Sequence, residues 1–338
     1  MITVSHLAKH YLVHKRPPGV LAAMRSLLKR SYEPVIAVKD LSFAIAPGER
    51  VGFLGPNGAG KTTTLKMLAG LLHPTSGEAT VAGFVPRERK VEFLRSITLV
   101  TGQKQQLLWD LPPSETFELN RVLFDVPTAQ YRRTLDELVE LLGIAPLLDK
   151  PTRQLSLGER MKCELAAALI HRPKVLFLDE PTIGLDVTMQ SAVRGFIRHY
   201  NERFGATVLL TSHYMEDVAA LCPRVIVIDH GRLTYDGQLE SLVHEVRPGK
   251  RLTLRFSRVA PRAEVEAVGG RIVELENEGA IVQVETAELR EVISRALTML
   301  PVEDLKVEDA PLEEVLADLF ARSAREAADG AGPKEELT

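Results

Sequence analysis

The stretch GFLGPNGAGKTTTLKMLAGLL, residues 52–72, constrains the fold of this chain more than any other part of it. Glycines crowd its first half, and a lysine and three threonines follow. The pattern G-x-x-x-x-G-K-T runs from Gly55 to Thr62, which is the pattern of a phosphate-binding loop. The apolar segment RVGFL before it is typical of a buried strand, and the apolar spacing after it is typical of a helix. Strand, loop and helix in this order indicate an α/β fold.

The residue types within the loop suit a bound triphosphate. Gly58 and Gly60 let the backbone turn its N–H groups inward toward an anion, and the start of the helix adds partial positive charge there. We expect Lys61 to reach the terminal phosphates, the hydroxyl of Thr62 to bind Mg²⁺, and Thr63 to hydrogen-bond a phosphate oxygen. A glycine-rich turn that merely caps a helix is the alternative. The agreement of loop, lysine, hydroxyl and both flanks favours a nucleoside triphosphate site.

Length, composition and charge limit the classes of protein that fit. The 338 residues suit one large domain with a small one, and the apolar fraction of 45% is ordinary for a protein with a real core. A net charge of −3 gives no basic field, so we expect no nucleic-acid partner. No apolar run approaches a membrane span and no secretory signal is visible, so a membrane role would need spans from another chain. Cys163 and Cys222 lack metal-ligand spacing and predict buried or idle thiols in a reducing compartment.

A second group of candidate site residues follows the apolar run Val175–Leu178. That run predicts a buried parallel strand, which delivers Asp179 and Glu180 at its carboxyl end, where open α/β sheets place their ligands. Asp179 is suited to holding Mg²⁺, and Glu180 is placed to polarise an attacking water as a general base. The alternative is that the two carboxylates are ordinary solvent-exposed side chains at the end of a strand, with no role in a site. The phosphate loop upstream favours the site.

Two further segments have a structural and a functional interpretation. In LSLGERMKCELAAALIHRP, Ser156 is a suitable N-cap and Glu159 stands three residues later, as in a capping box. The simpler interpretation is a well-capped helix, but its position shortly before the carboxylate strand favours a role in the site. His213 ends the apolar strand TVLLTSH. A lone histidine is usually structural or exposed, but this one falls at the sheet edge of the phosphate loop, which favours contact with the γ-phosphate.

The organisation of the chain predicts a large domain over residues 1–242. It opens with an alternating strand and a basic insertion at 15–34, and its helical part covers about 105–172. Composition changes near residue 245, where short strands and amphipathic helices predict a small α+β module over 243–321. That module shows no catalytic constellation. Small and polar residues predict a disordered tail over 322–338.

Taken together, these motifs carry a family resemblance. GPNGAGKTT, LSLGE, LFLDEPTIGLD and TSH, in this order and spacing, resemble the ATP-binding subunits of ABC transporters over about residues 1–240. The resemblance implies a P-loop NTPase with a RecA-like core, an antiparallel β subdomain and a helical subdomain, using ATP and Mg²⁺. The basic insertion and the C-terminal module resemble the exporter branch, of ABC-2 type, that has one ATP-binding chain and a separate membrane chain.

The resemblance also implies roles for individual residues. It makes Glu180, His213 and Gln103 catalytic and Thr62, Gln103 and Asp179 ligands of Mg²⁺. Ser156, Gly158 and Glu159 match the signature that reaches across a dimer to the partner's γ-phosphate, and Asp186 matches the loop that links the two sites. Tyr11 resembles the aromatic residue that stacks on adenine. The phosphate-loop residues that would contact ATP are Gly55, Pro56, Asn57, Gly58, Ala59, Gly60, Lys61, Thr62 and Thr63.

Some of these assignments have rivals or depart from the family pattern. Tyr32 competes with Tyr11 because of the insertion between them, and Gln105 and Gln106 compete with Gln103. The signature usually reads LSGGQ, whereas this chain reads LSLGE. Leu157 therefore replaces a glycine, and Glu159 brings a negative charge near phosphates.

The implied mechanism needs two chains. One sheet edge supplies the phosphate loop, the Mg²⁺ ligand and the base, and the signature of a second copy, placed head to tail, would complete the site. ATP would then hold the dimer together and hydrolysis would loosen it, which drives an integral membrane subunit from the cytoplasmic face of the membrane. A soluble ABC ATPase of translation or DNA repair is the first rival, and a regulator that only binds ATP is the second. The sequence does not give the transported substrate.

Overall fold

The computed structural model describes residues 1–14, 32–102 and 106–329 of the chain. It divides into two compact units, Met1–Gly237 and Gln238–Thr338. The boundary falls a few residues before the predicted one at 242, because the first helix of the second unit, α9 (Leu239–Val246), precedes the change in composition. In the described ranges no helix is both long and apolar enough to cross a bilayer.

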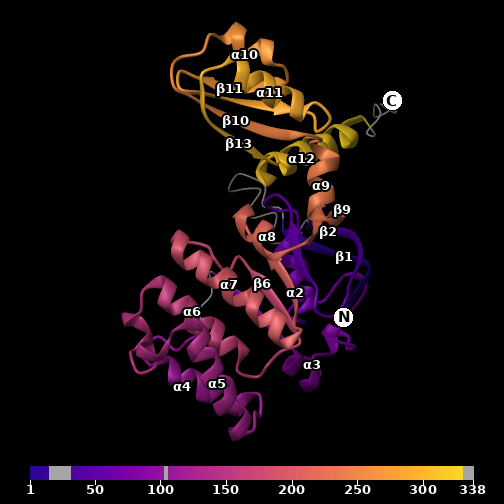
Figure 1. Cartoon of the computed structure of the whole chain (residues 1–338). Helices are drawn as coiled ribbons and strands as arrows, with labels where there is room; N and C mark the ends of the chain where they lie inside the picture. The colour runs from indigo at the N-terminus through magenta and orange to yellow at the C-terminus, as the bar shows by residue number, and fades with distance from the viewer. Residues whose placement is uncertain (15–31, 103–105, 330–338) are drawn as a thin grey trace, which may run out of the picture. The chain divides into compact units, whose positions relative to one another are not determined.

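The first unit is built on one sheet that joins an antiparallel part to a parallel part (Figure 1). In the antiparallel part, β1 pairs with both β2 and β4; β8, β3, β7, β6 and β5 pair in parallel. The strands lie in the order β4 (Ser76–Val81), β1 (Ile2–His14), β2 (Tyr32–Ile45), β9 (Arg232–Gln238), β8 (Arg224–Asp229), β3 (Arg50–Leu54), β7 (Thr207–Thr211), β6 (Val175–Asp179) and β5 (Ile97–Thr101).

The parallel strands are continuously apolar because helices cover both of their faces. Val175, Phe177 and Leu209 are fully buried, as expected for strands in the middle of such a sheet. β6 pairs in register with β7 on one side and β5 on the other, so that Asp179 lies opposite Thr211 and Thr101. The carboxyl ends of β3, β6 and β7 therefore meet at one edge of the sheet, where the candidate site residues follow.

Helices of this unit fall into two groups. α2 (Lys61–Leu68), α7 (Val187–Phe204) and α8 (Met215–Leu221) follow the parallel strands, and α3 (Val91–Ser96) precedes β5. α4 (Pro113–Leu123), α5 (Thr128–Leu142) and α6 (Leu157–Leu169) form the predicted helical part. Figure 1 shows these three gathered to one side of α7, with α2 on the other. Short 3₁₀ turns complete the unit: Pro86–Glu88, Ala145–Leu147 and Thr152–Gln154.

The second unit contains a four-stranded antiparallel sheet with a β-α-β-β-α-β chain order. Its strands are β10 (Lys250–Phe256), β11 (Arg271–Glu276), β12 (Gly279–Val284) and β13 (Val302–Glu308), in the spatial order β11-β12-β10-β13. α10 (Arg262–Val268) and α11 (Leu289–Met299) are the two crossovers. This is the ferredoxin-like arrangement. Alternate residues of β10 enter a common core with both helices: Leu252, Leu254 and Phe256.

The last helix of the second unit, α12 (Leu312–Asp329), continues into the segment that composition predicted to be disordered. Residues 322–329 are helical because alanine and glutamate there have high helix propensity. Arg322 also donates a hydrogen bond to the carbonyl of Val246, 2.9 Å away, at the end of α9. The prediction of a disordered tail from residue 322 is therefore wrong for this stretch, and residues 330–338 lie outside the described residues.

Candidate nucleotide site

The phosphate loop leaves β3 and enters α2 through glycines in the left-handed backbone region. Gly58 has φ of 82° and Gly60 has φ of 105°. A Cβ at residue 60 would lie 2.5 Å from the carbonyl oxygen of Ala37, far inside van der Waals contact. Both conformation and space therefore require glycine at 60. Within the turn, the N–H of Ala59 donates to the carbonyl of Pro56 at 3.1 Å, and this hydrogen bond stabilises the curved conformation of the loop.

Lys61 begins α2 and lies back against the loop. Its Nζ donates to the carbonyl oxygens of Gly55, at 2.6 Å, and Pro56, at 3.1 Å. Only 9% of the residue is exposed, and this burial lowers the pKa of its ammonium group, while the carboxylates of Glu180 and Asp179 oppose the shift. A single cation is thus held next to the loop's N–H groups and close to two carboxylates.

Asp179 lies beside the loop and accepts hydrogen bonds from two threonines. The Oγ1 of Thr62 lies 3.1 Å from Asp179 Oδ2, and the Oγ1 of Thr211 lies 2.6 Å from Asp179 Oδ1. Sequence reasoning missed Thr211, whose only signal is that it ends β7, the strand next to β6. A hydroxyl and a carboxylate that face each other would supply two of the oxygen ligands that Mg²⁺ prefers.

Glu180 occupies a strained backbone conformation. Its φ is 57°, in the left-handed region that glutamate rarely enters. Its N–H donates to the carbonyl of Thr211 at 3.0 Å, and its carbonyl accepts from Ile183 at 3.3 Å. The carboxylate lies 2.8 Å from Nε2 of His213, with 17% of the Glu180 side chain and 46% of the His213 side chain exposed. The structure thus joins Glu180, the predicted base, directly to His213, the predicted contact of the γ-phosphate, and both follow the ends of neighbouring strands.

The signature segment forms the predicted capping box at the start of α6. The Oγ of Ser156 accepts from the N–H of Glu159 at 3.3 Å, and the Glu159 carboxylate accepts from the N–H of Ser156 at 2.8 Å. The same hydrogen bond lowers the pKa of Glu159. The carboxylate that departs from the family's glutamine is therefore engaged in capping the helix. The structure thus confirms the capping box that was predicted from the four residues Ser156–Glu159.

Around the signature, the chain packs tightly onto the loop that precedes α7. A Cβ at Gly158 would lie 2.7 Å from Cε of Met189, so a side chain at this position would have to displace the methionine side chain. A Cβ at Gly184 would lie 3.2 Å from Cδ2 of Leu157. Asp186 caps α7 by accepting from the N–H of Met189 at 2.9 Å. The signature and the Asp186 loop of one chain are therefore in contact.

The structure gathers the candidate residues into two groups. Lys61, Thr62, Asp179, Glu180 and His213 share the carboxyl edge of the sheet. Ser156, Gly158, Glu159 and Asp186 share the starts of α6 and α7. In the described part of the chain no hydrogen bond or ion pair joins one group to the other, and α6 and α2 lie on opposite sides of α7 (Figure 1).

Three remaining candidates differ in what the structure says of them. Tyr11 lies in β1 opposite Val35, 37% exposed, with Lys9 Nζ 5.3 Å from its ring centroid. Tyr32 pairs through its backbone with His14 at the start of β2. Gln103 and Gln105 lie outside the described residues. Gln106 is described, and its side chain donates to the carbonyl of Leu99 at 3.0 Å, so this amide is engaged with β5.

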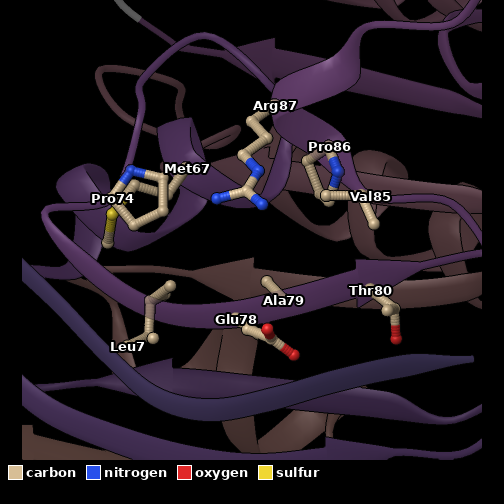
Figure 2. A pocket seen from close by; sticks show the side chains of 10 residues that line it. Leu7, Met67, Pro74, Glu78, Ala79, Thr80, Val85, Pro86 and Arg87 are labelled. Carbon is tan, nitrogen blue, oxygen red and sulfur yellow. The ribbon is translucent and has the colours of Figure 1, made fainter.

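A separate pocket of about 110 Å³ lies in the β part of the unit, away from these residues. Buried Leu7 and Met67 contribute to its lining, and Figure 2 shows Arg87 extending into it opposite the strand that carries Glu78 and Ala79. None of the candidate site residues lines it.

The two cysteines take no part in either group. Both are free and buried, as predicted, and burial raises the pKa of each thiol to about 12. Thiols with so little thiolate at neutral pH are unreactive.

Comparison with known proteins gives two family matches. Residues 38–183 match the ABC transporter family, and residues 248–308 match the C-terminal domain of EvrA-like ABC transporters. The first match contains the phosphate loop, the signature, Asp179 and Glu180. The second covers most of the ferredoxin-like part of the second unit.

Relatives and solved structures agree with these matches. The ABC transporter ATP-binding protein NatA of Bacillus subtilis is 38% identical over 213 residues, which are 63% of this chain and 86% of NatA. The Nod factor export ATP-binding protein I of Paraburkholderia xenovorans is 38% identical, over 64% of this chain and 70% of that protein. The dimeric post-hydrolysis structure of the ATP-binding cassette MJ0796 with ADP and Pi aligns with a TM-score of 0.59 at 23% identity, covering 71% of this chain and 99% of the cassette.

Proposed function

Because this chain belongs to the ABC transporter ATP-binding proteins, a family of ATPases, we propose that it powers an exporter through a separate integral membrane subunit. Relatives named for Nod factor export and for linearmycin resistance support export. A methionine import protein is also 34% identical over 69% of the chain, so the family alone does not set the direction of transport. The match of the second unit to EvrA-like transporters adds to the argument for a transporter.

The proposed site roles follow the two groups of residues. Backbone N–H groups of residues 57–63, with Lys61, bind the phosphates of ATP, and Tyr11 stacks on adenine. Thr62 and Asp179 would hold Mg²⁺, which would neutralise charge on the phosphates, and Gln103 would join them. The 3.1 Å contact between the Thr62 hydroxyl and the Asp179 carboxylate supports this ligand pair. Glu180 accepts the proton of the attacking water, and His213 orients the Glu180 carboxylate and contacts the γ-phosphate.

The observation that carries the proposal is the separation of the two groups within one chain. The sheet edge offers a base, a cation and a phosphate loop, whereas α6, whose N-cap is Ser156, lies on the other side of α7 from α2 (Figure 1). A helix start is a site for anions. Two copies arranged head to tail would bring the Ser156–Glu159 corner of each chain to the γ-phosphate bound by its partner, and Asp186 would link the two sites.

An exposed apolar surface on the helical part supports a membrane-subunit partner. Leu108, Trp109 and Leu111 are 42%, 49% and 44% exposed, and Leu119, Val122 and Leu123 of α4 are exposed by 51%, 60% and 67%. Clusters of exposed apolar side chains mark interaction surfaces. We place the cytoplasmic part of the membrane subunit on this surface, which puts the ATPase at the cytoplasmic face of the membrane.

The decisive experiment replaces Glu180 with glutamine. Phosphate release should fall by about 10²–10⁴-fold, because the general base is lost. ATP binding should persist, so a dimer should accumulate with ATP in size-exclusion chromatography. Glu140→Gln is the matched control, since this glutamate is exposed on α5 and its loss should leave the rate unchanged. A Glu180→Gln protein that turns over ATP at the wild-type rate would remove Glu180 from this role, and wild-type monomers that are fully competent would overturn the shared site.

The partner is tested by co-purification. Leu119→Asp, on the apolar surface, should lose the membrane protein that co-purifies with the wild-type chain, while ATP binding stays intact. Leu297→Asp is the control, because Leu297 is similarly exposed, at 58%, but lies on α11 of the second unit. Equal retention by both variants would place the contact elsewhere. Absence of any membrane protein with the wild-type chain would favour the soluble ABC ATPase instead.

A further inference from the structure

Asp217 is a buried carboxylate that the proposed mechanism does not use. It lies in the first turn of α8, and the residue is 0% exposed. A buried carboxylate is stable only when its oxygens are matched by donors, so its partners show what it organises.

The donors to Asp217 come from three different segments of the chain. Its Oδ2 accepts from the hydroxyl of Thr182 and, at 2.8 Å, from the hydroxyl of Ser212. Its Oδ1 accepts from Nη1 of Arg194 at 2.8 Å, and only 13% of the arginine side chain is exposed. Thr182 and Ser212 are themselves 1% and 5% exposed. The contacts are therefore dry and charge-assisted, which makes them strong and directional.

Each of these segments carries a residue of the proposed site. Thr182 follows Glu180 by two positions, in the turn closed by the hydrogen bond from Ile183 to the Glu180 carbonyl. Ser212 directly precedes His213, and its Oγ also accepts from the N–H of Tyr214 at 3.0 Å, so it fixes the backbone on both sides of the histidine. Arg194 belongs to α7, which begins at the Asp186 cap.

We propose that Asp217 is a positioning residue that locks the Glu180 turn, the His213 turn and α7 into one rigid assembly. This inference rests on the proposed function, in which Glu180 is the base. The strained backbone of Glu180 persists only where contacts with the surrounding structure hold it in place. Asp217 supplies such a contact by binding Thr182, two positions after Glu180. The Asp217 carboxylate also binds Arg194 of α7, the helix whose N-cap is Asp186. A displacement of α7 would therefore shift the position of Glu180.

The test is Asp217→Asn, which keeps the shape of the side chain and removes its charge and one acceptor. The value of kcat should fall between about tenfold and about 100-fold, as for a misplaced catalytic group, with the affinity for a fluorescent ATP analogue unchanged within about twofold. The fluorescent analogue also counts folded sites, so the rate is expressed per binding site. Asp136→Asn, the same change at an exposed position on α5, is the control and should leave both values unchanged.

A double-mutant cycle with Glu180→Gln separates positioning from a merely structural role. If Asp217 acts through the base, the double mutant should be no slower than Glu180→Gln alone, because residues that act as a unit are not additive. Rate losses that multiply would overturn the proposal, and so would a wild-type kcat in Asp217→Asn. If that variant does not fold, Thr182→Val, which removes one donor only, is placed in the same cycle with the same criteria.

The outcomes distinguish this inference from the proposed function. A fully active Glu180→Gln protein would refute the role of the base itself. An inactive Glu180→Gln protein beside a fully active Asp217→Asn protein would refute only the positioning role.

Discussion

The sheet edge of the first unit and the helix α12 of the second unit both hold several carboxylates, but they use them differently. At the edge, Asp179 and Glu180 are bonded to threonine hydroxyls and a histidine, which are groups that a nucleotide and a cation could displace. On α12, Glu314 and Asp318 pair with Arg247 and Arg251, which join the helix to α9 and β10. The first arrangement leaves charge available for chemistry, and the second neutralises charge to hold elements together. Carboxylates therefore indicate a site by the partners they have, not by their number.

The largest expected effect is that of Lys61→Ala, which removes the one cation of the edge group. ATP affinity should fall by about tenfold to about 100-fold, because a charge-assisted hydrogen bond contributes roughly 1.5–3 kcal/mol. Turnover should be lost with it, as measured by fluorescent nucleotide titration and phosphate release. Lys66→Ala, later in the same helix, should leave both unchanged. An unchanged affinity of Lys61→Ala for ATP would show that the charged groups at the sheet edge, like those on α12, only hold the fold together.

Next in size is a pair of glycine substitutions with opposite signs. Gly60→Ala should destabilise the first unit by at least about 1 kcal/mol, because a left-handed backbone and the Ala37 carbonyl both exclude a Cβ. Gly195→Ala, in the interior of α7 with nothing within 4 Å, should stabilise the unit by about 0.5–1 kcal/mol. Denaturant unfolding measures both. Equal effects would mean that neither the loop's strain nor the helix propensity controls stability here.

A smaller effect is expected for Glu159→Gln, which keeps the capping hydrogen bond and loses the charge. Its stability cost at pH 7 should be at the low end of about 0.3–1 kcal/mol, because the carboxylate is partly exposed to solvent. The pKa of Glu159 is lowered in the folded protein, so the charge stabilises the fold above the ordinary value of 4.5. That contribution should vanish as the pH falls through the folded pKa. Unfolding curves of both proteins from pH 7 to pH 3 that keep a constant difference would contradict this.

The smallest effect is expected for Asp318→Asn, the corresponding change on α12. Loss of the bond to Arg247 should cost less than about 1 kcal/mol, since 43% of the Asp318 side chain is exposed. The ion pair lowers the pKa of Asp318, so this contribution also disappears in acid. The ATPase rate should stay at the wild-type value. A clear loss of ATPase activity would break the comparison and give the second unit a role in catalysis.

Local patterns made part of this molecule predictable. The capping box needs only Ser156 and Glu159, and the structure confirms it because a helix start depends on four neighbouring residues. The strand before Asp179 could be predicted from its continuous apolar run. The apolar strand before His213 predicted its place at the sheet edge of the phosphate loop, but the contact of His213 with Glu180 was not predicted.

Contacts and strand order that depend on residues far apart in the sequence could not be predicted. Thr211 and Asp217 are ordinary residue types at a strand end and a helix start, and only the tertiary fold shows what they contact. The alternating segments after residue 245 predicted strands, but periodicity does not determine the order β11-β12-β10-β13. Composition alone predicts a disordered tail over residues 322–329, because linkers and alanine-rich helices share small and polar residues.

The left-handed backbone at Glu180 has an evolutionary consequence. Glycine and asparagine tolerate this conformation better than glutamate does, so either replacement at this position would relax the local backbone while removing the base. Selection for fold stability alone would therefore favour the replacement of glutamate at position 180. A copy of this gene freed from the need to split ATP could thus become a nucleotide sensor by one substitution, with a gain rather than a loss in fold stability.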